Sequence, residues 1–465
     1  MNPALTNKNP RPVLSLADCL KHADETKELI VQKNALEEIP GLLRKCFDVD
    51  SVCIVADGNT FKAAGQRVKE LLEEAGIPVK GIHIFPAEPR LHADYAHVDF
   101  LKNWISSLSG SSRLVPVSVG SGTVNDLVKR TSFELKHPYF SAPTAASVDG
   151  FTPNGASLLW NGFKQTLPCS APRALAADTA VIAAAPAYLS SSGFGDLASK
   201  IIAGTDWIIA EKAGALGAPG AQAIDPLVWS MVQNGLLDAL NRSVNASKGD
   251  EEAIKTLFQS LAITGFAMQY MKSSRPVSGA EHLFSHVWEM EDLSFNGVPV
   301  THGHKVAIGT LAATAFTEIF FADPKGPPAR AGIHKRLSRE ERKAEVSAAF
   351  KDSRACDMAL ATAMEKMTDE KTAEAITLAF MDSWKDIRER VLERLLPYGE
   401  LKALLAKAGC PLLPESIGLS RTRAIATARK AQMIRNRYNI LDLSWDMGYF
   451  STVLDTMESS GVYLH

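Results

Sequence analysis

The stretch Ser51-Val-Cys-Ile-Val-Ala56, closed by the turn Asp57-Gly58-Asn59, decides the fold of this chain. A short run of β-branched and apolar residues that ends in turn-forming residues is typical of a buried strand. The next segment, residues 61–75, places its apolar residues on one face of a helix that Gly76 ends. The sequence therefore predicts a strand, a turn and a helix in succession.

The same alternation extends to both sides of this stretch. A helix is expected before it, through Glu28–Cys46. After it, strands are expected at Val79–Phe85, Leu114–Val119 and Pro138–Ala142, with helices near Asp94–Leu108 and from Thr123. Strands that alternate with helices at this spacing predict a doubly wound parallel sheet in an α/β domain.

The second part of the chain has a different pattern, because strand signals fade beyond about Gln165. Helices are expected at Lys255–Met271, Arg339–Ala363, Asp369–Leu404 and Ser420–Tyr438, with a Pro/Gly-rich loop at 323–332. We therefore expect an α/β nucleotide domain at residues 1–165 and an all-α domain at residues 166–465. Ligands usually bind in the cleft of such a pair, at the carboxyl ends of the strands.

Composition excludes several classes of protein. The 465 residues carry a net charge of -2, so no electrostatic footprint for nucleic acid or an acidic membrane is expected. The six cysteines have no paired spacing and are expected to be reduced thiols. The first residues lack a signal-peptide pattern, and the alanine-rich stretch 171–189 is broken by prolines and charges. A soluble cytoplasmic protein without membrane insertion is expected.

A glycine-rich turn lies where the strand 114–119 opens into the helix from Thr123. It runs Gly120-Ser121-Gly122-Thr123, with Asp126 one turn further on. Glycines let a backbone approach a pyrophosphate, and the amino end of a helix offers free amides and a favourable dipole. The loop is neither a G-x-G-x-x-G motif nor a P-loop, so a purely structural turn is an equally good interpretation.

Asp57, at the end of the first strand, also has two interpretations. Its carboxylate can accept hydrogen bonds from an adenosine ribose and repel a 2′-phosphate, which favours NAD over NADP. It can equally form an Asx turn in Asp57-Gly58-Asn59.

Two longer motifs carry a family resemblance. The segments Gly120-Ser-Gly-Thr-Val-Asn-Asp126 and Ser141-Ala-Pro-Thr144-Ala-Ala-Ser147-Val-Asp149-Gly150 resemble the paired signatures of the glycerol-1-phosphate dehydrogenases. These enzymes belong to the iron-containing alcohol dehydrogenase and dehydroquinate synthase-like group. The resemblance continues through Gly193-Phe-Gly-Asp196, Glu281-His282-Leu-Phe-Ser-His286, His302-Gly-His304 and Ile417-Gly-Leu-Ser-Arg421. It covers the chain from about Asp50 onward and implies a dehydroquinate synthase-like fold.

The resemblance implies roles for individual residues. The dinucleotide cradle is Gly120, Ser121, Gly122, Thr123 and Asp126, with Asp57, Thr144 and Ser147 as further contacts. Asp149, Asp196 and His286 fall on substrate-contacting positions, and Asp196, His282 and His302 on the metal-ligand positions. Three features depart from the family pattern: Pro153 replaces a serine, His304 replaces an acidic residue, and residues 206–281 form a longer segment.

The residue types suit a catalytic metal. One carboxylate and two imidazoles offer oxygen and nitrogen donors to a divalent cation and leave positions open for substrate oxygens. His286 lies one helical turn from His282, on the same face, and is the candidate for moving the proton. Taken singly, Asp196 could cap the next helix and the histidines could be surface residues. The tail arginines 421, 423, 429, 435 and 437 are expected on a solvated or intersubunit helix.

The resemblance implies reduction of dihydroxyacetone phosphate to sn-glycerol 1-phosphate with NAD, or NADP as the second choice, and one divalent metal. Zinc and nickel suit this donor set, with iron as a further candidate. Two alternatives are a dehydrogenase of another polyol or polyol phosphate and a dehydroquinate synthase-like lyase. A homodimer that acts on a small molecule is expected.

Overall fold

The computed structural model of the chain describes residues 13–109, 113–160, 163–326, 337–351 and 353–465. These residues divide into two compact units. The sheet unit comprises Val13–Leu197 and Leu237–Ser273, and the helical unit comprises Ala198–Leu236 and the described residues from Ser274 onward. Each unit is described by itself below.

A parallel sheet of six strands, in the order β1-β8-β5-β4-β2-β3, organises the sheet unit. The central strands β2 (Ser51–Asp57) and β4 (Leu114–Gly120) are almost wholly buried, as their apolar sequences predict. The other predicted strands are present as β3 (Val79–Phe85) and β5 (Phe140–Pro143). The prediction of a doubly wound parallel sheet is confirmed.

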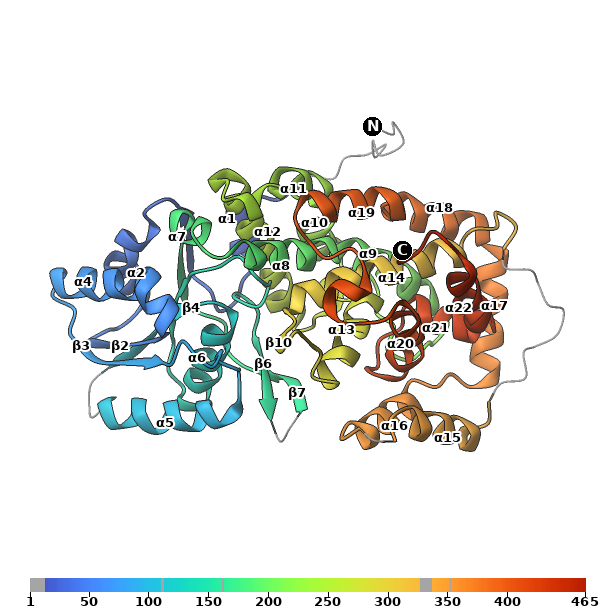
Figure 1. Cartoon of the computed structure of the whole chain (residues 1–465), viewed down its shortest axis with the longest axis horizontal. Helices are drawn as coiled ribbons and strands as arrows, with labels where there is room; N and C mark the ends of the chain where they lie inside the picture. The colour runs from blue at the N-terminus through green and yellow to red at the C-terminus, as the bar shows by residue number, and fades with distance from the viewer. Residues whose placement is uncertain (1–12, 110–112, 161–162, 327–336, 352) are drawn as a thin grey trace. The chain divides into compact units, whose positions relative to one another are not determined.

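Helices cover both faces of this sheet, as Figure 1 shows. One face packs on α2 (Ile39–Cys46) and α4 (Gln66–Glu74), through Leu43, Val68 and Leu72. The other face packs on α5 (Tyr95–Ser109) and α6 (Gly122–Leu135). Alternate residues of β2 serve the two cores, since Ile54 lies in the first and Val55 in the second. The sheet is thus buried on both sides, and its loops carry the polar groups.

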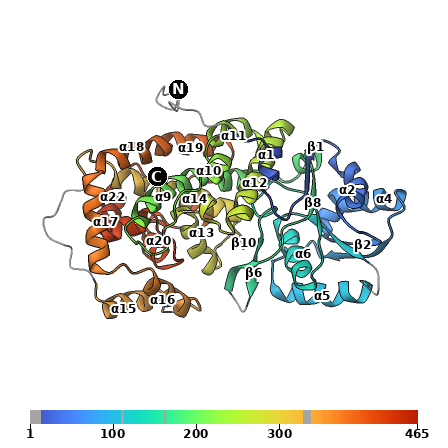
Figure 2. The same ribbon diagram turned by 180° about the vertical axis from the view of Figure 1, so that it is seen from behind.

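Two expectations for the sheet were wrong. Residues Glu28–Gln32, expected to be helical, form the edge strand β1, and helix begins only at Ile39. Strands also continue beyond Gln165, because Ala174–Asp178 forms β8 between β1 and β5. Figure 2 shows β1 and β8 from behind. A separate antiparallel hairpin, β6 (Gly155–Trp160) with β7 (Phe163–Pro168), was not predicted.

The sheet unit also contains α1 (Leu16–Leu20), α7 (Thr179–Ala183) and α12 (Glu251–Met271). Two more of its helices reach the helical unit by one residue each: α8 (Ala187–Ala198) by its last residue and α11 (Leu236–Ser243) by its first. The helical unit is built from α9 (Lys200–Gly214), α13 (Ala280–Met290), α14 (His302–Phe320) and the helices that follow. Those are α15 (Arg339–Ala349), α16 (Cys356–Glu365), α17 (Glu370–Asp382), α18 (Trp384–Arg394), α19 (Tyr398–Lys407), α20 (Arg421–Met433), α21 (Ile440–Asp446) and α22 (Phe450–Ser459). An all-α second part was predicted; the structure confirms that it is mostly helical, with strands at Ala174–Asp178, Ser294–Phe295 and Val298–Pro299.

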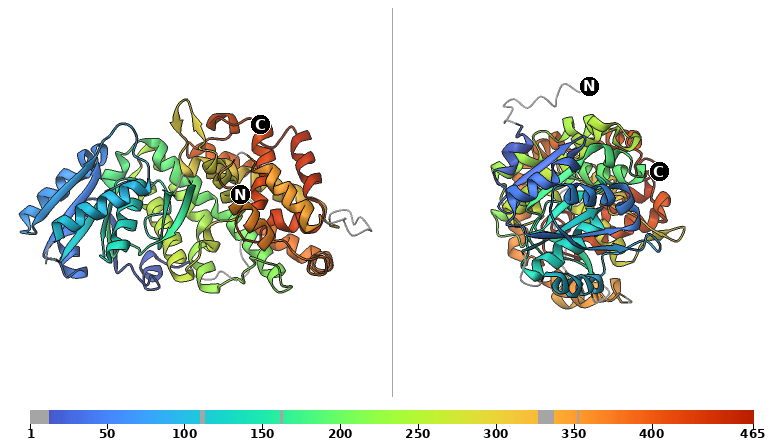
Figure 3. Two further views of the ribbon diagram at one scale, coloured as in Figure 1. Left: turned by 90° about the horizontal axis from the view of Figure 1, so that it is seen from below. Right: turned by 90° about the vertical axis from the view of Figure 1, so that its left-hand side faces the viewer.

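A short hairpin, β9 (Ser294–Phe295) with β10 (Val298–Pro299), joins α13 to α14. Its yellow ribbon stands out from the surrounding helices in the left view of Figure 3. Among the described residues, no helix is long and apolar enough to cross a membrane. All six cysteines lie in the described part of the chain and are free thiols, as expected. Of the Pro/Gly-rich loop predicted at 323–332, residues 327–332 lie outside the described residues.

Candidate metal and dinucleotide site

The glycine-rich turn joins β4 to α6, as predicted. β4 ends at Gly120, Ser121 is the N-cap residue of α6, and the Ser121 hydroxyl makes no capping hydrogen bond. A β-carbon on Gly120 would lie 2.5 Å from the β-carbon of Val124, so only glycine fits this turn. The first amides of α6 are therefore not capped by Ser121, and the helix dipole favours an anion at this end.

Thr144 and Ser147 lie beside this turn on the loop after β5. The Thr144 amide donates to the Gly120 carbonyl oxygen at 3.1 Å, which places the ends of β4 and β5 side by side. Ser147 is buried, and its carbonyl oxygen accepts a hydrogen bond from the Ser192 hydroxyl at 3.2 Å. Both residues lie at the carboxyl edge of the sheet, where parallel sheets bind ligands.

Asp57 forms a turn at the end of β2. Its Oδ1 accepts hydrogen bonds from the amides of Asn59 and Thr60, both at 2.9 Å, in a capping box with Thr60. The Asx-turn interpretation is therefore confirmed, while contact with a ribose stays a prediction.

Asp126 and Lys129 hold the chain around the β6–β7 hairpin. Asp126 Oδ2 accepts from the Ser157 amide at 3.2 Å. The fully buried Lys129 ammonium donates to the carbonyl oxygens of Gly150 at 2.7 Å and Gly155 at 3.0 Å. Lys129 thus fixes the loop that follows Asp149. Sequence reasoning missed it, although its place one turn after Asp126 in α6 was a usable signal.

Asp149 and Asp196 are in direct contact within the sheet unit. The Asp149 amide donates to Asp196 Oδ2 at 2.9 Å, and Asp196 is fully buried in α8. The N-cap residue of the next helix is Ser199, so Asp196 is not a helix cap.

The three predicted histidines gather on α13 and α14 of the helical unit. His282 and His286 lie on one face of α13, with ring centroids 6.1 Å apart. His302 opens α14, and its ring centroid is 5.4 Å from that of His282 and 6.4 Å from that of His286. α13 and α14 pack closely. A β-carbon added to Gly309 of α14 would lie only 2.4 Å from the carbonyl oxygen of Glu281 in α13.

Each of the two predicted histidine ligands is paired with a buried carboxyl group. His282 Nδ1 lies 2.7 Å from Glu281 Oε1, and His302 Nδ1 lies 2.7 Å from Glu289 Oε1. A carboxylate that accepts from Nδ1–H leaves the Nε2 lone pair of the same ring free for a metal. Sequence reasoning missed both glutamates, although Glu281 precedes His282 directly.

The charge state of His282 also suits metal binding, which requires neutral imidazole. Burial, with a smaller contribution from the Lys200 ammonium, holds the pKa of His282 well below its usual range. Burial likewise lowers the pKa of His286 to about 3 and that of His304, which is half-buried in α14, to about 4.

Asp196, His282 and His302 each offer one ligand atom, and these atoms lie within 4.8 Å of one another. Asp196 lies in α8, two residues before Ala198. Ala198 is the residue at which the helical unit begins. One carboxylate oxygen and two imidazole nitrogens form a donor set that suits a divalent cation and leaves positions open.

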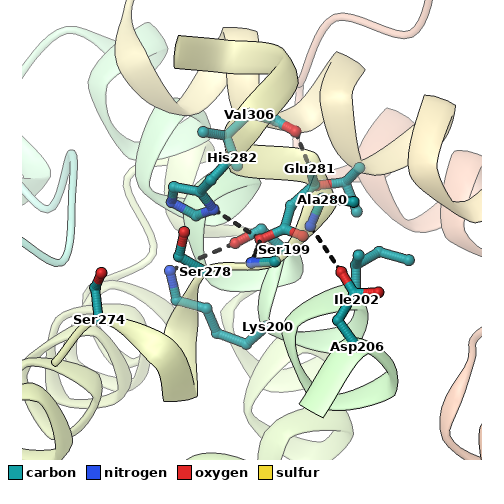
Figure 4. A network of polar contacts seen from close by, with 12 residues as sticks. Ser199, Lys200, Ile202, Asp206, Ser274, Ser278, Ala280, Glu281, His282 and Val306 are labelled. Atoms are coloured by element: carbon teal, nitrogen blue, oxygen red, sulfur yellow. Dashed lines mark hydrogen bonds and ion pairs between the residues drawn. The ribbon is translucent and has the colours of Figure 1, made fainter. Parts of the chain in front are cut away.

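A network of hydrogen bonds holds the amino end of α13. Asp206 of α9 accepts the Ala280 amide at its Oδ2 at 2.7 Å and the Ile440 amide at its Oδ1 at 2.9 Å. Figure 4 shows Asp206, Ala280, Glu281 and His282 in this arrangement. Arg275 donates from Nη1 to the Tyr438 carbonyl oxygen and from Nη2 to the Asp206 carbonyl oxygen, both at 2.7 Å.

Arg437 also belongs to this network and corrects an expectation. It donates to the Ser278 carbonyl oxygen at 2.6 Å and to the Ser274 hydroxyl at 2.7 Å. The predicted helix Ser420–Tyr438 is shorter in the structure, because α20 ends at Met433 and Arg437 lies beyond it. The interpretation of the tail arginines as part of a solvated or intersubunit helix is wrong for Arg437, which lies outside α20 and binds the segment before α13.

Comparison with known proteins gives a consistent result. Residues 30–186 match the family model described as iron-containing alcohol dehydrogenase. A glycerol-1-phosphate dehydrogenase (NAD(P)+) of Halalkalibacterium halodurans is 32% identical over 324 residues, which cover 68% of this chain and 78% of that protein. One of Bacillus velezensis is 29% identical over 422 residues, 90% of this chain and 91% of that protein.

Solved structures share the fold at lower identity. The structure of a 1,3-propanediol oxidoreductase matches with a TM-score of 0.58 and 14% identity, over 92% of this chain and 98% of that chain. Glycerol dehydrogenase from Schizosaccharomyces pombe matches with a TM-score of 0.52 and 16% identity, over 95% and 94% of the two chains. Given the extent and identity of the sequence matches, this chain belongs to the glycerol-1-phosphate dehydrogenase family, within the iron-containing alcohol dehydrogenases.

Proposed function

We propose that this chain is a metal-dependent dehydrogenase that reduces dihydroxyacetone phosphate to sn-glycerol 1-phosphate with NADH or NADPH, and that it also catalyses the reverse reaction. The substrate and the cofactor follow from the names of the relatives. The observation that carries the reaction type is the group of Asp196, His282 and His302, with both imidazoles held at Nδ1 by carboxyl groups.

The roles that we propose for the residues follow the two domains predicted from the sequence. Residues 1–165 bind the dinucleotide, and residues 166–465 hold the metal and most of the substrate contacts. Gly120–Thr123 and the amino end of α6 would hold the dinucleotide phosphates, because no Ser121 side chain competes for the amides there. The further cofactor contacts are Asp57, Asp126, Thr144 and Ser147, and the substrate contacts are Asp149, Asp196 and His286.

The chemistry needs one divalent metal, zinc or nickel before iron, held by Asp196, His282 and His302. When bound, the metal supplies Lewis-acid stabilisation of the negative charge on the substrate oxygen during hydride transfer. His286 is neutral at physiological pH, because burial holds its pKa at about 3. Its Nδ1 faces Glu289, so Nε2 is the atom that faces the substrate hydroxyl. In alcohol oxidation Nε2 would accept the hydroxyl proton and release it to water, and in ketone reduction it would relay a proton from water to the substrate oxygen.

Metal analysis of the purified protein, combined with a screen of NADH and NADPH oxidation, tests this proposal. The screen covers dihydroxyacetone phosphate, dihydroxyacetone and larger ketose phosphates. Oxidation with dihydroxyacetone phosphate and one bound metal per chain is expected. Oxidation only with unphosphorylated ketones would make another polyol the substrate. Absence of net NADH conversion with every ketone would favour a dehydroquinate synthase-like lyase.

The His282→Ala variant tests the metal site itself. Because His282 supplies one of three ligands, both metal content and turnover should fall to background. Normal activity in that variant would contradict the assignment. We also propose that the chain forms a cytoplasmic homodimer that acts on small molecules and not on nucleic acid. Sedimentation tests the homodimer, and cell fractionation tests the location.

A further inference from the structure

We infer that Glu289 is a positioning residue that orients His302 and His286 together. Its one carboxylate fixes the tautomer of both the metal ligand, His302, and the proton carrier, His286. This inference rests on the proposed function, because it assumes that His302 binds the metal. Nothing in the sequence motifs or in the comparisons assigns a role to Glu289.

The first support is the geometry of the carboxylate. Glu289 lies on the last turn of α13 and is only 7% exposed. Its Oε1 lies 2.7 Å from His302 Nδ1, and its Oε2 lies 3.3 Å from His286 Nδ1. The two oxygens of one side chain are thus divided between two imidazoles on different helices.

The second support is the charge around this carboxylate. The Lys305 ammonium lies 3.4 Å from Oε1, and its side chain is nearly buried. A buried carboxylate is stable when a cation and hydrogen-bond donors surround it. Lys305 from α14 therefore places a positive charge beside the Glu289 oxygen that faces His302.

The third support is the chemistry of the acceptor. An ionised carboxylate only accepts hydrogen bonds, so each facing Nδ1 must carry a hydrogen. With its hydrogen on Nδ1, each of these two imidazoles presents a bare Nε2 atom. A metal ligand needs that lone pair, and a group that receives a substrate proton needs it as well.

Glutamine at this position separates the role of the carboxylate from its shape. A glutamine side chain has the same length but only one acceptor oxygen, and its amide group donates. Glu289→Gln can therefore satisfy the Nδ1–H of one histidine but not of both. The other histidine will adopt the tautomer with a hydrogen on Nε2.

The first experiment measures the affinity of the full-length protein for Zn²⁺ by competition with a chromogenic chelator, without nucleotide. For Glu289→Gln we expect binding 10-fold to 100-fold weaker than for the wild type, the usual effect of losing an outer partner of a metal ligand. The control is Glu291→Gln, two residues further on. Glu291 forms ion pairs with Arg423 and Lys430 of α20 and not with the histidines, so Zn²⁺ affinity should not change.

The second experiment does not depend on a variant. Nitrogen-15 NMR of histidine-labelled wild-type protein reports which ring nitrogen carries the hydrogen. We expect hydrogen on Nδ1 of both His302 and His286, in the zinc-loaded protein and after chelation. Hydrogen on Nε2 of either ring, or unchanged Zn²⁺ affinity in a folded Glu289→Gln protein, would overturn the inference.

These outcomes are separate from those of the proposed function. If the wild type binds Zn²⁺ but oxidises no NADH or NADPH with dihydroxyacetone phosphate, the proposed reaction fails while the Glu289 measurements still decide this inference. If the tautomers are as expected but Glu289→Gln binds Zn²⁺ normally, the positioning role fails and the proposed reaction is untouched.

Discussion

Gly193 of α8 lies directly against the peptide carbonyl of Ala146, where an added β-carbon would stand 1.9 Å from the oxygen. This approach lets α8 pack closely on segment 144–149, which carries Thr144, Ser147 and Asp149. It also places Asp196, one turn further along α8, where it accepts the Asp149 amide.

Gly193→Ala should therefore damage both stability and metal binding. The added methyl group must push α8 away from a rigid backbone carbonyl, and overpacking of this kind costs about 1–3 kcal/mol. We expect a lower melting temperature and less than one zinc per chain. Calorimetry and metal analysis measure the two effects. Gly41→Ala in α2 is the matched control, because nothing lies within 4 Å of its added β-carbon.

Asp57→Asn tests the choice between NAD and NADP. Asparagine caps a helix as well as aspartate does, so the turn with Asn59 and Thr60 should survive. Loss of the negative charge removes a repulsion of the 2′-phosphate of about 1 kcal/mol. The ratio of kcat/KM for NADPH to that for NADH should then rise roughly fivefold. An unchanged ratio with an unchanged melting temperature would limit Asp57 to its structural role.

Removal of the metal should destabilise the protein. A ligand present at 100 times its dissociation constant stabilises the folded state by about 2.7 kcal/mol. Addition of EDTA should therefore lower the melting temperature by several degrees, and Zn²⁺ should restore it. In His302→Ala the melting temperature should not respond to either reagent. A full EDTA effect in that variant would show that the stabilising metal binds elsewhere.

Lys129→Met should loosen the loop after Asp149. The carbonyl oxygens of Gly150 and Gly155 would each lose a buried donor, at a cost of about 1–3 kcal/mol per group. We expect a lower urea midpoint and a higher KM for the ketone, because Asp149 precedes Gly150. Lys136→Met, an exposed lysine just after the same helix, should leave both values unchanged.

Asp206 predicts a pH dependence of stability. Burial raises its pKa to about 6 from the model-compound value of 3.8. Between these values the folded protein keeps a proton that the unfolded chain has lost, so stability falls as pH rises through this window. The contribution is about 3 kcal/mol, for a shift of about two pH units. The urea midpoint of the wild type should be lower at pH 6.5 than at pH 4. This difference should be smaller in Asp206→Asn.

The sequence predicts the central strands well because their environment is uniform. β2 and β4 are buried on both faces, so their apolar runs are unbroken and end in clear turns. β1 offers only the three-residue apolar run Leu29–Val31, and β8 carries no such signal. β8 is Ala-Leu-Ala-Ala-Asp, a composition that favours helix, and it is extended only because β1 and β5 pair with it. Long-range pairing of this kind leaves no local pattern.

Some contacts of the candidate site could also be predicted from the sequence, and others could not. His282 and His286 could be placed together, because a spacing of four residues puts two side chains on one helical face. The contact of Glu289 with His302 could not be predicted, since it joins two helices across the β9–β10 hairpin. The binding of Arg437 to Ser274 and Ser278 likewise depends on how the chain returns after α20.

The anchoring of residues 437–440 beneath α13 has a consequence for the order of events during synthesis. The ribosome delivers His282 and His302 long before it delivers Tyr438 and Ile440. Until those residues arrive, the carboxylate of Asp206 lacks the Ile440 amide and the guanidinium of Arg275 lacks the Tyr438 carbonyl oxygen, although each keeps its other backbone partner. We therefore expect metal loading to be a late event, completed after the tail has docked, so that unfinished chains carry little metal.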